Sequence, residues 1–321
     1  MGYSQDNFIR TKELYEAKRT RAIKLSEDRR RAIHAISPTI AEIDRQLSST
    51  GLKLFRAACD GGDALAERLA EVRAENEALL EKRRALLADM GYPADYTEVH
   101  YECTDCCDTG YLENTHMCPC MKRALTAEGF RSSGLGVLAD KQSFDNFSLA
   151  YYQADADTYA LMKANLEVMR AYAEGFDTKS GNLLLIGGTG LGKTHLSTAV
   201  AKAVIERGYD VLYDSAPNIL ADFEHDKFKN YRDEAPKSEK YFDCDLLIID
   251  DLGTEISTQV TLSFLYNLIN TRLNRGKSTV ISTNLAQKEL LSRYDARLTS
   301  RFLGEYRILQ FRGVDIRLQR D

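Results

Sequence analysis

The chain has 321 residues and a formal net charge of -5 at pH 7, and 44% of its residues are hydrophobic. This length is sufficient for two domains, and the apolar content is that of a globular protein. The negative charge excludes a uniformly basic nucleic-acid-binding protein, so any contact with DNA has to be local. Because the chain has neither a signal-peptide pattern nor an apolar run of membrane-spanning length, we expect a cytoplasmic protein without a membrane partner.

Residues 1–95 are charged and poor in glycine and proline, which predicts a helical region. One helix is expected from Asn7 to Ile36, with a restart at Ser37-Pro38, and a second long helix from Asp63 to about Met90. The apolar residues of the second helix form one heptad stripe: Leu65, Leu69, Val72, Leu79, Leu86 and Met90. Asn76 and Arg83 interrupt that stripe, and polar residues at such positions fix the register of paired helices. The pattern indicates a helical hairpin or short coiled coil, either self-contained or binding a partner.

Five of the seven cysteines lie between Cys103 and Cys120. In a reducing cytosol such a cluster indicates a metal site rather than disulfides. Cys103 and Cys106 form a CxxC pair and Cys118 and Cys120 a CxC pair, so that four thiolates can bind one zinc ion tetrahedrally. A structural site is favoured, since a catalytic zinc keeps one position open. Three further residues could replace one ligand: Cys107, His100 and His116. We therefore expect a small zinc-binding module at residues 96–135.

The stretch NLLLIGGTGLGKTHL reads as an apolar strand, a glycine-rich loop and the start of a helix. Its residues 187–194 match the pattern GxxxxGK[ST], in which backbone N–H groups and the helix N-terminus bind phosphates. We expect Lys193 to contact the β- and γ-phosphates and the Thr194 hydroxyl to bind Mg²⁺. The residues predicted to surround the nucleotide phosphates are Gly187, Gly188, Thr189, Gly190, Leu191, Gly192, Lys193, Thr194 and His195.

Two further strands are predicted to end in polar residues at the same edge of a parallel sheet. The stretch DLLIIDDLGTE places Asp250 and Asp251 after four apolar residues, and STVISTN ends in Asn284. We expect Asp250 to hold Mg²⁺ through water and Asp251 to orient or deprotonate the attacking water. Asn284 suits a sensor of the γ-phosphate. Three arginines follow, at positions 297, 301 and 317. An arginine near the transferred phosphoryl group stabilises the transition state, but for any one of these arginines taken alone a surface salt bridge is favoured.

Together these stretches resemble the AAA+ ATPases, and within them the bacterial helicase loaders of the DnaC and DnaI type and the related IstB transposition helpers. The resemblance covers residues 144–317, and its markers are SFDNF, GGTGLGKTHL, LLIIDDLG, VISTN, RLTSRF and GVDIR. It implies an α/β fold for residues 136–321, in which a five-stranded parallel sheet lies between helices. It also implies that Asn284 is sensor 1, Arg301 the trans-acting arginine finger and Arg317 the sensor 2 arginine, with Phe144 and Phe147 near the adenine.

The resemblance further implies a function. In loaders of the DnaI type a helical, zinc-containing region ahead of the ATPase binds a hexameric DnaB-type replicative helicase, which the loader places on single-stranded DNA. The expected cofactors are ATP, Mg²⁺ and Zn²⁺, with self-association through the ATPase domain. Asp251 stands where most AAA+ proteins have glutamate, which predicts slow, switch-like hydrolysis. Two alternatives are a transposition helper ATPase and a nucleotide-gated adaptor without enzymatic activity. Basic and aromatic residues alternate at 227–232, as in single-strand binders, but the flanking acidic residues favour an ordinary exposed helix.

Overall fold

The computed structural model describes residues 3–60, 65–113, 115–228 and 236–319. The chain divides into two compact units, of which the larger contains Met1–Thr11 and Pro119–Asp321 and the smaller Lys12–Cys118. The predicted functional division at residues 95 and 135 differs from these boundaries and stays a prediction. Across the described residues, none of the helices is both long and apolar enough to cross a bilayer.

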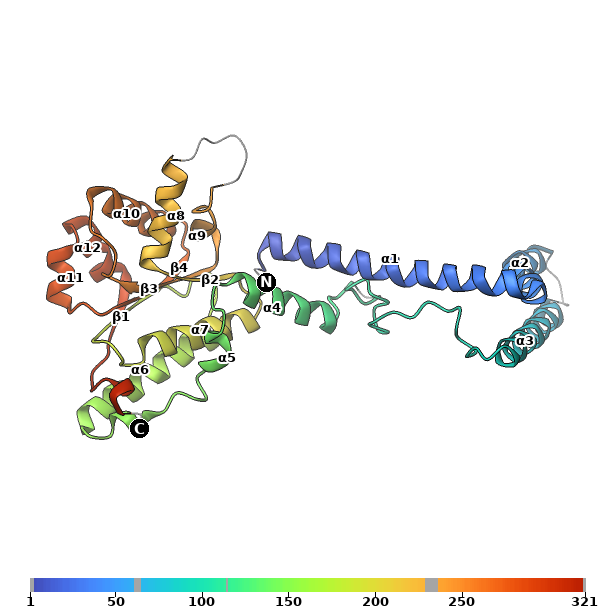
Figure 1. The fold of residues 1–321 in the computed structure, drawn as a ribbon, viewed down its shortest axis with the longest axis horizontal. Helices are drawn as coiled ribbons and strands as arrows, with labels where there is room; N and C mark the ends of the chain where they lie inside the picture. Colours follow the sequence, from blue (N-terminus) through green and yellow to red (C-terminus); the bar gives the residue numbers. More distant parts are fainter. Residues whose placement is uncertain (1–2, 61–64, 114, 229–235, 320–321) are drawn as a thin grey trace. The chain divides into compact units, whose positions relative to one another are not determined.

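The larger unit contains a five-stranded sheet in the order β2-β3-β4-β1-β5, with every neighbouring pair parallel (Figure 1). Its strands are β1 (Asn182–Ile186), β2 (Val211–Ser215), β3 (Leu246–Leu252), β4 (Ser278–Thr283) and β5 (Tyr306–Gln310). The central strands are buried over most of their length because helices cover both faces of the sheet. The predicted α/β fold class is confirmed.

The helices of this unit pack on the two faces of the sheet. In chain order they are α4 (Pro119–Ser132), α5 (Leu138–Lys141), the 3₁₀ turn η1 (Leu149–Tyr152), α6 (Ala156–Glu174), α7 (Lys193–Glu206), α8 (Ala216–Phe228), α9 (Lys240–Asp243), α10 (Gln259–Asn274), α11 (Gln287–Arg293), α12 (Ala296–Glu305) and the 3₁₀ turn η2 (Ile316–Gln319). Figure 1 shows α6 and α7 on one face and α8, α10 and α12 on the other. Successive strand residues such as Leu184 and Leu185 point to opposite faces of the sheet and therefore belong to different core clusters.

Helix α4 lies beside the first turns of α1 (Gln5–Ile36) within the larger unit. The side-chain amide of Asn7 donates to the hydroxyl of Ser132 at 2.7 Å, and Arg10 forms an ion pair with Glu128 at 3.6 Å. The beginning of the chain is thus part of the larger unit, which the sequence analysis did not predict.

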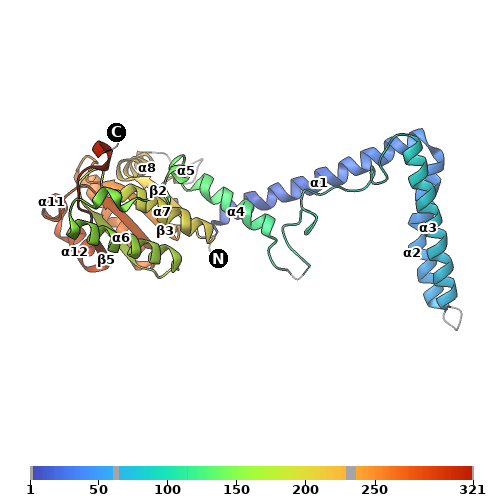
Figure 2. The same cartoon turned by 90° about the horizontal axis from the view of Figure 1, so that it is seen from below.

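The smaller unit is mostly helical. It contains α1 from residue 12 on, α2 (Pro38–Asp60) and α3 (Leu65–Asp89), with the last two side by side in Figure 2. Helix α2 begins at Pro38 as predicted, and Ile33, Ile40 and Leu87 are buried at the junction of the three helices. The predicted start of the second long helix, Asp63, lies outside the described residues.

The polar residues that interrupt the α3 stripe hydrogen-bond to α2. Asn76 accepts a hydrogen bond from the Thr50 hydroxyl at 2.7 Å, and the guanidinium of Arg83 donates to Asp44 at 2.7 Å. A second nitrogen of Arg83 donates to the hydroxyl of Thr97 at 2.6 Å. These pairs favour one register of the hairpin, because a shift along the helix would leave partly buried polar groups without partners.

Candidate functional site

The phosphate loop connects β1 to α7. Gly190 and Gly192 have φ angles of +74° and +84°, which glycine adopts without strain. A Cβ on Gly192 would lie 2.8 Å from the ring of Phe147 and 2.9 Å from the hydroxyl of Tyr152, and that hydroxyl donates to the carbonyl of Leu191 at 3.0 Å. The side chains of Phe147 and Tyr152 therefore pack against the loop.

Lys193 lies at the centre of this loop. Its ammonium group donates to the carbonyls of Gly187 and Gly188, both at 2.7 Å, and to the side-chain oxygen of Asn284 at 2.8 Å. Burial lowers the pKa of Lys193 to about 8, and the nearby carboxylates of Asp251 and Asp250 offset only part of that effect. A phosphate group at this position would favour the charged lysine.

Asp250, at the end of β3, accepts hydrogen bonds from three hydroxyl groups on three elements. The Thr194 hydroxyl, in the first turn of α7, donates to it at 3.1 Å. Tyr213 on β2 and Ser282 on β4 also donate to its carboxylate. Thr194 and Asp250, the two residues predicted to hold Mg²⁺, are thus adjacent. Tyr213 and Ser282 were not predicted, because no local pattern marks a strand hydroxyl that points at a neighbouring strand.

Asp251 has a φ angle of +55°, unusual for a residue other than glycine, at an irregularity in the pairing of β3 with β4. Its N–H donates to the hydroxyl of Ser282 at 3.1 Å, and its carboxylate accepts from the amide of Asn284 at 3.2 Å. Burial and the neighbouring Asp250 raise the pKa of Asp251. A carboxylate with a raised pKa is a better base, so this side chain can orient or deprotonate a water molecule.

A cavity of about 340 Å³ contains most of these groups. Its lining residues are Leu138, Gln142, Thr189, Gly190, Leu191, Gly192, Lys193, Thr194, His195, Asp251, Asn284, Ile316 and Arg317. The structure therefore brings Arg317, from the turn η2, to the phosphate loop. Leu138 and Gln142 were missed, since the segment before SFDNF carries no recognisable pattern.

The two phenylalanines implied by the resemblance do not line this cavity. Phe147 is buried behind the loop, with its ring centre 5.3 Å from that of His195. Phe144 is half-buried, and the guanidinium of Arg170 lies over its ring, 5.5 Å from the ring centre. A role of these rings in adenine binding stays a prediction.

Arg301 also lies outside the cavity, on α12. Its guanidinium donates to the side-chain oxygen of Asn270 at 2.6 and 3.0 Å and stands 4.6 Å from the ring centre of Tyr266. Arg297 approaches the same ring at 5.2 Å. A finger that acts in a neighbouring subunit has to lie away from its own site, so this position is compatible with the predicted role and leaves it untested.

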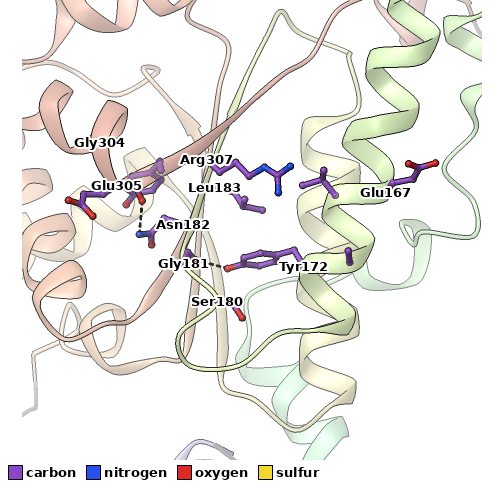
Figure 3. A pocket seen from close by; sticks show the side chains of 12 residues that line it. Glu167, Tyr172, Ser180, Gly181, Asn182, Leu183, Gly304, Glu305 and Arg307 are labelled. Atoms are coloured by element: carbon purple, nitrogen blue, oxygen red, sulfur yellow. Dashed lines mark hydrogen bonds between the residues drawn. The ribbon is translucent and has the colours of Figure 1, made fainter.

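A larger cavity of about 690 Å³ lies at the amino ends of β1 and β5 (Figure 3). Figure 3 shows Glu167 and Tyr172 on α6, with Arg307 on β5. The Tyr172 hydroxyl donates to the carbonyl of Gly181 at 3.0 Å. None of the predicted site residues lines this cavity. Ligands of open parallel sheets bind at the carboxyl ends of the strands, so we assign the nucleotide site to the smaller cavity.

The cysteine segment forms a candidate metal site. The Sγ atoms of Cys103, Cys106, Cys118 and Cys120 lie within 4.8 Å of one another, and those of Cys103 and Cys118 are 3.8 Å apart. Four sulfurs bound tetrahedrally to zinc at about 2.3 Å would be about 3.8 Å apart, so the donor set fits this ion. The three substitute ligands considered from sequence, Cys107, His100 and His116, are outside the group.

Asp108 orders the turn that carries the first cysteine pair. This buried residue has a φ angle of +55°, and its carboxylate accepts the N–H groups of Glu102 at 2.9 Å and Cys103 at 2.8 Å. The N–H of Cys118 donates to the carbonyl of Gly110 at 2.9 Å, which holds the second pair against the same turn. Hydrogen bonds of the backbone thus hold the thiols close together without a contribution from a metal ion.

A parallel sheet with a phosphate loop after β1, a carboxylate pair at the end of β3 and an asparagine after β4 defines the AAA+ class of P-loop nucleotide-binding proteins. The family model of the IstB-like ATP-binding proteins matches residues 144–320, which is more than half of the chain. The chain belongs to this family, and the resemblance predicted from the six motifs is confirmed.

The curated relatives have names that assign them to DNA replication. The replicative helicase loader DnaC of Escherichia coli (strain K12) is 26% identical over 173 residues, which cover 54% of this chain and 67% of DnaC. The chromosomal replication initiator protein DnaA of Aliarcobacter butzleri (strain RM4018) is 35% identical over 120 residues, which cover 37% of this chain and 27% of DnaA. The chain thus spans about a quarter of the length of the DnaA relatives it matches.

Solved structures are similar to a little more than half of the chain. A crystal structure of the DnaC helicase loader is 21% identical with a TM-score of 0.47, covering 54% of this chain and 98% of that one. A crystal structure of DnaI is 18% identical with a TM-score of 0.46, covering 57% of this chain and 94% of that one.

Proposed function

We propose that the protein is an ATP-dependent loader that binds a hexameric DnaB-type replicative helicase and places it on single-stranded DNA. The observation that carries this proposal is the union, in one chain, of an IstB-like nucleotide site with a helical unit and a four-cysteine cluster. The sequence similarity to the helicase loader DnaC over two thirds of that protein supports it. Residues 1–95 would bind the helicase, and residues 136–321 would act as its nucleotide switch in the cytoplasm.

The nucleotide switch would be an ATPase. Lys193 would bind the β- and γ-phosphates, and Thr194 and Asp250 would hold Mg²⁺. The ion neutralises phosphate charge when it is bound. Asp251 would accept the proton of the attacking water, while Asn284 holds that carboxylate and contacts the γ-phosphate. Arg317 also lines the cavity and would stabilise the charge that develops on the phosphates.

Self-association would complete the site. Arg301 cannot contact the nucleotide of its own subunit while it is bound to Asn270 and Tyr266, so we assign it to the site of a neighbouring copy. Arg301→Ala should then lower ATP hydrolysis of the assembled protein by about 10³-fold or more while leaving nucleotide binding unchanged. Hydrolysis by this variant at the wild-type rate would exclude a trans-acting role.

Zinc would be held by the four clustered cysteines in a structural site. A segment of this size buries little apolar surface, so metal binding would supply much of its folding free energy. Direct contact with single-stranded DNA would involve residues 227–232, of which 229–232 lie outside the described residues.

The proposal is tested by light scattering on gel filtration of the full chain mixed with the replicative helicase of the same cell, in ATP and in ADP. We expect a complex in ATP that Lys193→Met weakens, whereas Lys163→Ala, an exposed lysine on α6, leaves it intact. If no complex forms with any nucleotide and the protein instead binds a transposase and duplex DNA, the transposition-helper function replaces the loader.

A further inference from the structure

Tyr213 connects the nucleotide site to the segment that leaves α4. Its hydroxyl donates to the carboxylate of Asp250, while its backbone N–H donates to the carbonyl of Ser133 at 2.7 Å. Ser133 directly follows α4 (Pro119–Ser132), and α4 itself begins between the last two clustered cysteines. Tyr213 is therefore hydrogen-bonded through its side chain to Asp250, the proposed magnesium ligand, and through its backbone to the exit of α4.

The contact between the two backbones is close. Strand β2 is an edge strand, and residues 133–134 cover its outer side at Tyr213. Gly134 has a φ angle of +82°, and a Cβ at this position would lie 2.4 Å from the carbonyl oxygen of Tyr213. Any other residue at 134 would be strained and would also displace β2 or itself, so a movement of this segment is transmitted to Tyr213.

The side chain of Tyr213 is suited to transmit such a movement. Its ring is buried in the core cluster between the sheet and α7, and a tyrosine has only two side-chain torsions. When the backbone shifts, a ring enclosed in this way moves with it, and the hydroxyl changes its distance to Asp250. The other two hydroxyls on Asp250, from Thr194 and Ser282, belong to the nucleotide-binding core and have no such connection to α4 among the hydrogen bonds of the described residues.

We propose that Tyr213 is a positioning residue that couples α4 and its exit segment to Asp250, so that the position of α4 tunes Mg²⁺-nucleotide binding and bound nucleotide in turn alters the α4 exit. The coupling is reciprocal, because a free-energy link between two sites acts in both directions. This inference rests on the proposed ATPase function of the same site. It assigns to α4 the task of reporting the nucleotide state toward the cysteine segment.

The first test is a double-mutant cycle of Tyr213→Phe and Gly134→Ala. The quantity measured for each variant is the Mg²⁺ concentration that gives half-maximal ATP hydrolysis. Tyr213→Phe should raise this concentration about 10- to 100-fold, the usual effect of losing an outer partner of a metal ligand. Gly134→Ala should raise it in the wild-type background but add nothing in the Tyr213→Phe background. In the Ser282→Ala background, Gly134→Ala should keep its full effect. Tyr306→Phe, which removes another buried phenol hydroxyl of the same unit, is the matched control and should change nothing.

The second test does not require Gly134→Ala to fold. Hydrogen exchange of the full chain is measured with and without Mg²⁺ and a non-hydrolysable ATP analogue. In the wild type the analogue should slow exchange of the residue 213 amide, which is bonded to Ser133. In Tyr213→Phe this change should disappear although the analogue still binds.

Equal slowing of that amide in both proteins, or strictly additive effects in the cycle, would overturn the coupling. A wild-type protein that neither binds nor hydrolyses ATP would instead overturn the proposed function, so the two failures are distinguishable.

Discussion

The lowered pKa of Lys193 predicts that nucleotide affinity falls as the pH rises above 8. Burial lowers this pKa from 10.5 to about 8 in the protein without nucleotide. Between these two values the unfolded chain binds more protons than the folded one, so the stability of the nucleotide-free protein rises with pH there. Phosphate binding restores the charged lysine and takes up a proton, so affinity has to change in the opposite direction.

The size of the effect follows from the fraction of Lys193 that carries a proton. With a pKa of about 8 in the free protein, roughly 3% of the lysine is charged at pH 9.5 and roughly 76% at pH 7.5, so affinity should be roughly 25-fold weaker at pH 9.5, or about 2 kcal/mol. The assay is a titration with fluorescent ADP without Mg²⁺ between pH 7.5 and 9.5. Lys193→Met, which keeps the buried aliphatic chain, should bind weakly at every pH. An equal pH dependence in both proteins would refute the reasoning.

Three further predictions concern Asp251 as the proposed base, the helical unit and the cysteines. Asp251→Asn should lower kcat by about 10²- to 10⁴-fold with little change in nucleotide affinity, because it removes the base and keeps the shape; steady-state kinetics measure both. Arg83→Leu should lower the free energy of unfolding by about 1.5–3 kcal/mol, since a partly buried carboxylate loses its charged donor, whereas the exposed neighbour Arg84→Leu should have little effect in urea denaturation. Cys118→Ser should lower the bound zinc, measured by elemental analysis, and Cys107→Ser should retain it.

Each of these predictions has an outcome that contradicts it. A variant Asp251→Asn that hydrolyses ATP normally would transfer the role of base to another group. Equal destabilisation by the two arginine substitutions would mean that the hydrogen bonds of Arg83 do not set the register of the hairpin. Loss of zinc from Cys107→Ser, with retention in Cys118→Ser, would require a different ligand set.

Much of the nucleotide site was predictable because its residues are close together in sequence. The phosphate loop from Gly187 to Thr194 owes its shape to local backbone requirements, namely positive φ at Gly190 and Gly192 and a helix start at Lys193. Apolar runs ending in Asp250 and in Asn284 predicted parallel strands whose carboxyl ends meet. The four clustered cysteines were also identified by local spacing alone.

Other parts of the site depend on contacts between residues far apart in the chain. The hydroxyls of Tyr213 and Ser282 reach Asp250 across neighbouring strands, and a single tyrosine or serine in a strand has no pattern that announces its partner. The φ angle of +55° at Asp251 arises from the irregular pairing of β3 with β4, which depends on register. Such features exist only once the sheet is assembled.

The sequence by itself determined the class of the protein, the phosphate-binding loop, the acidic pair and the four thiols, because each follows from residue types at short, fixed spacing. Only the tertiary structure decided which side chains surround them, that Arg317 reaches the phosphate loop while Arg301 does not, and that the exit of α4 pairs with the edge of the sheet at Tyr213. The physical reason is that long-range contacts are selected by packing and by the pairing of buried polar groups, which no local pattern encodes.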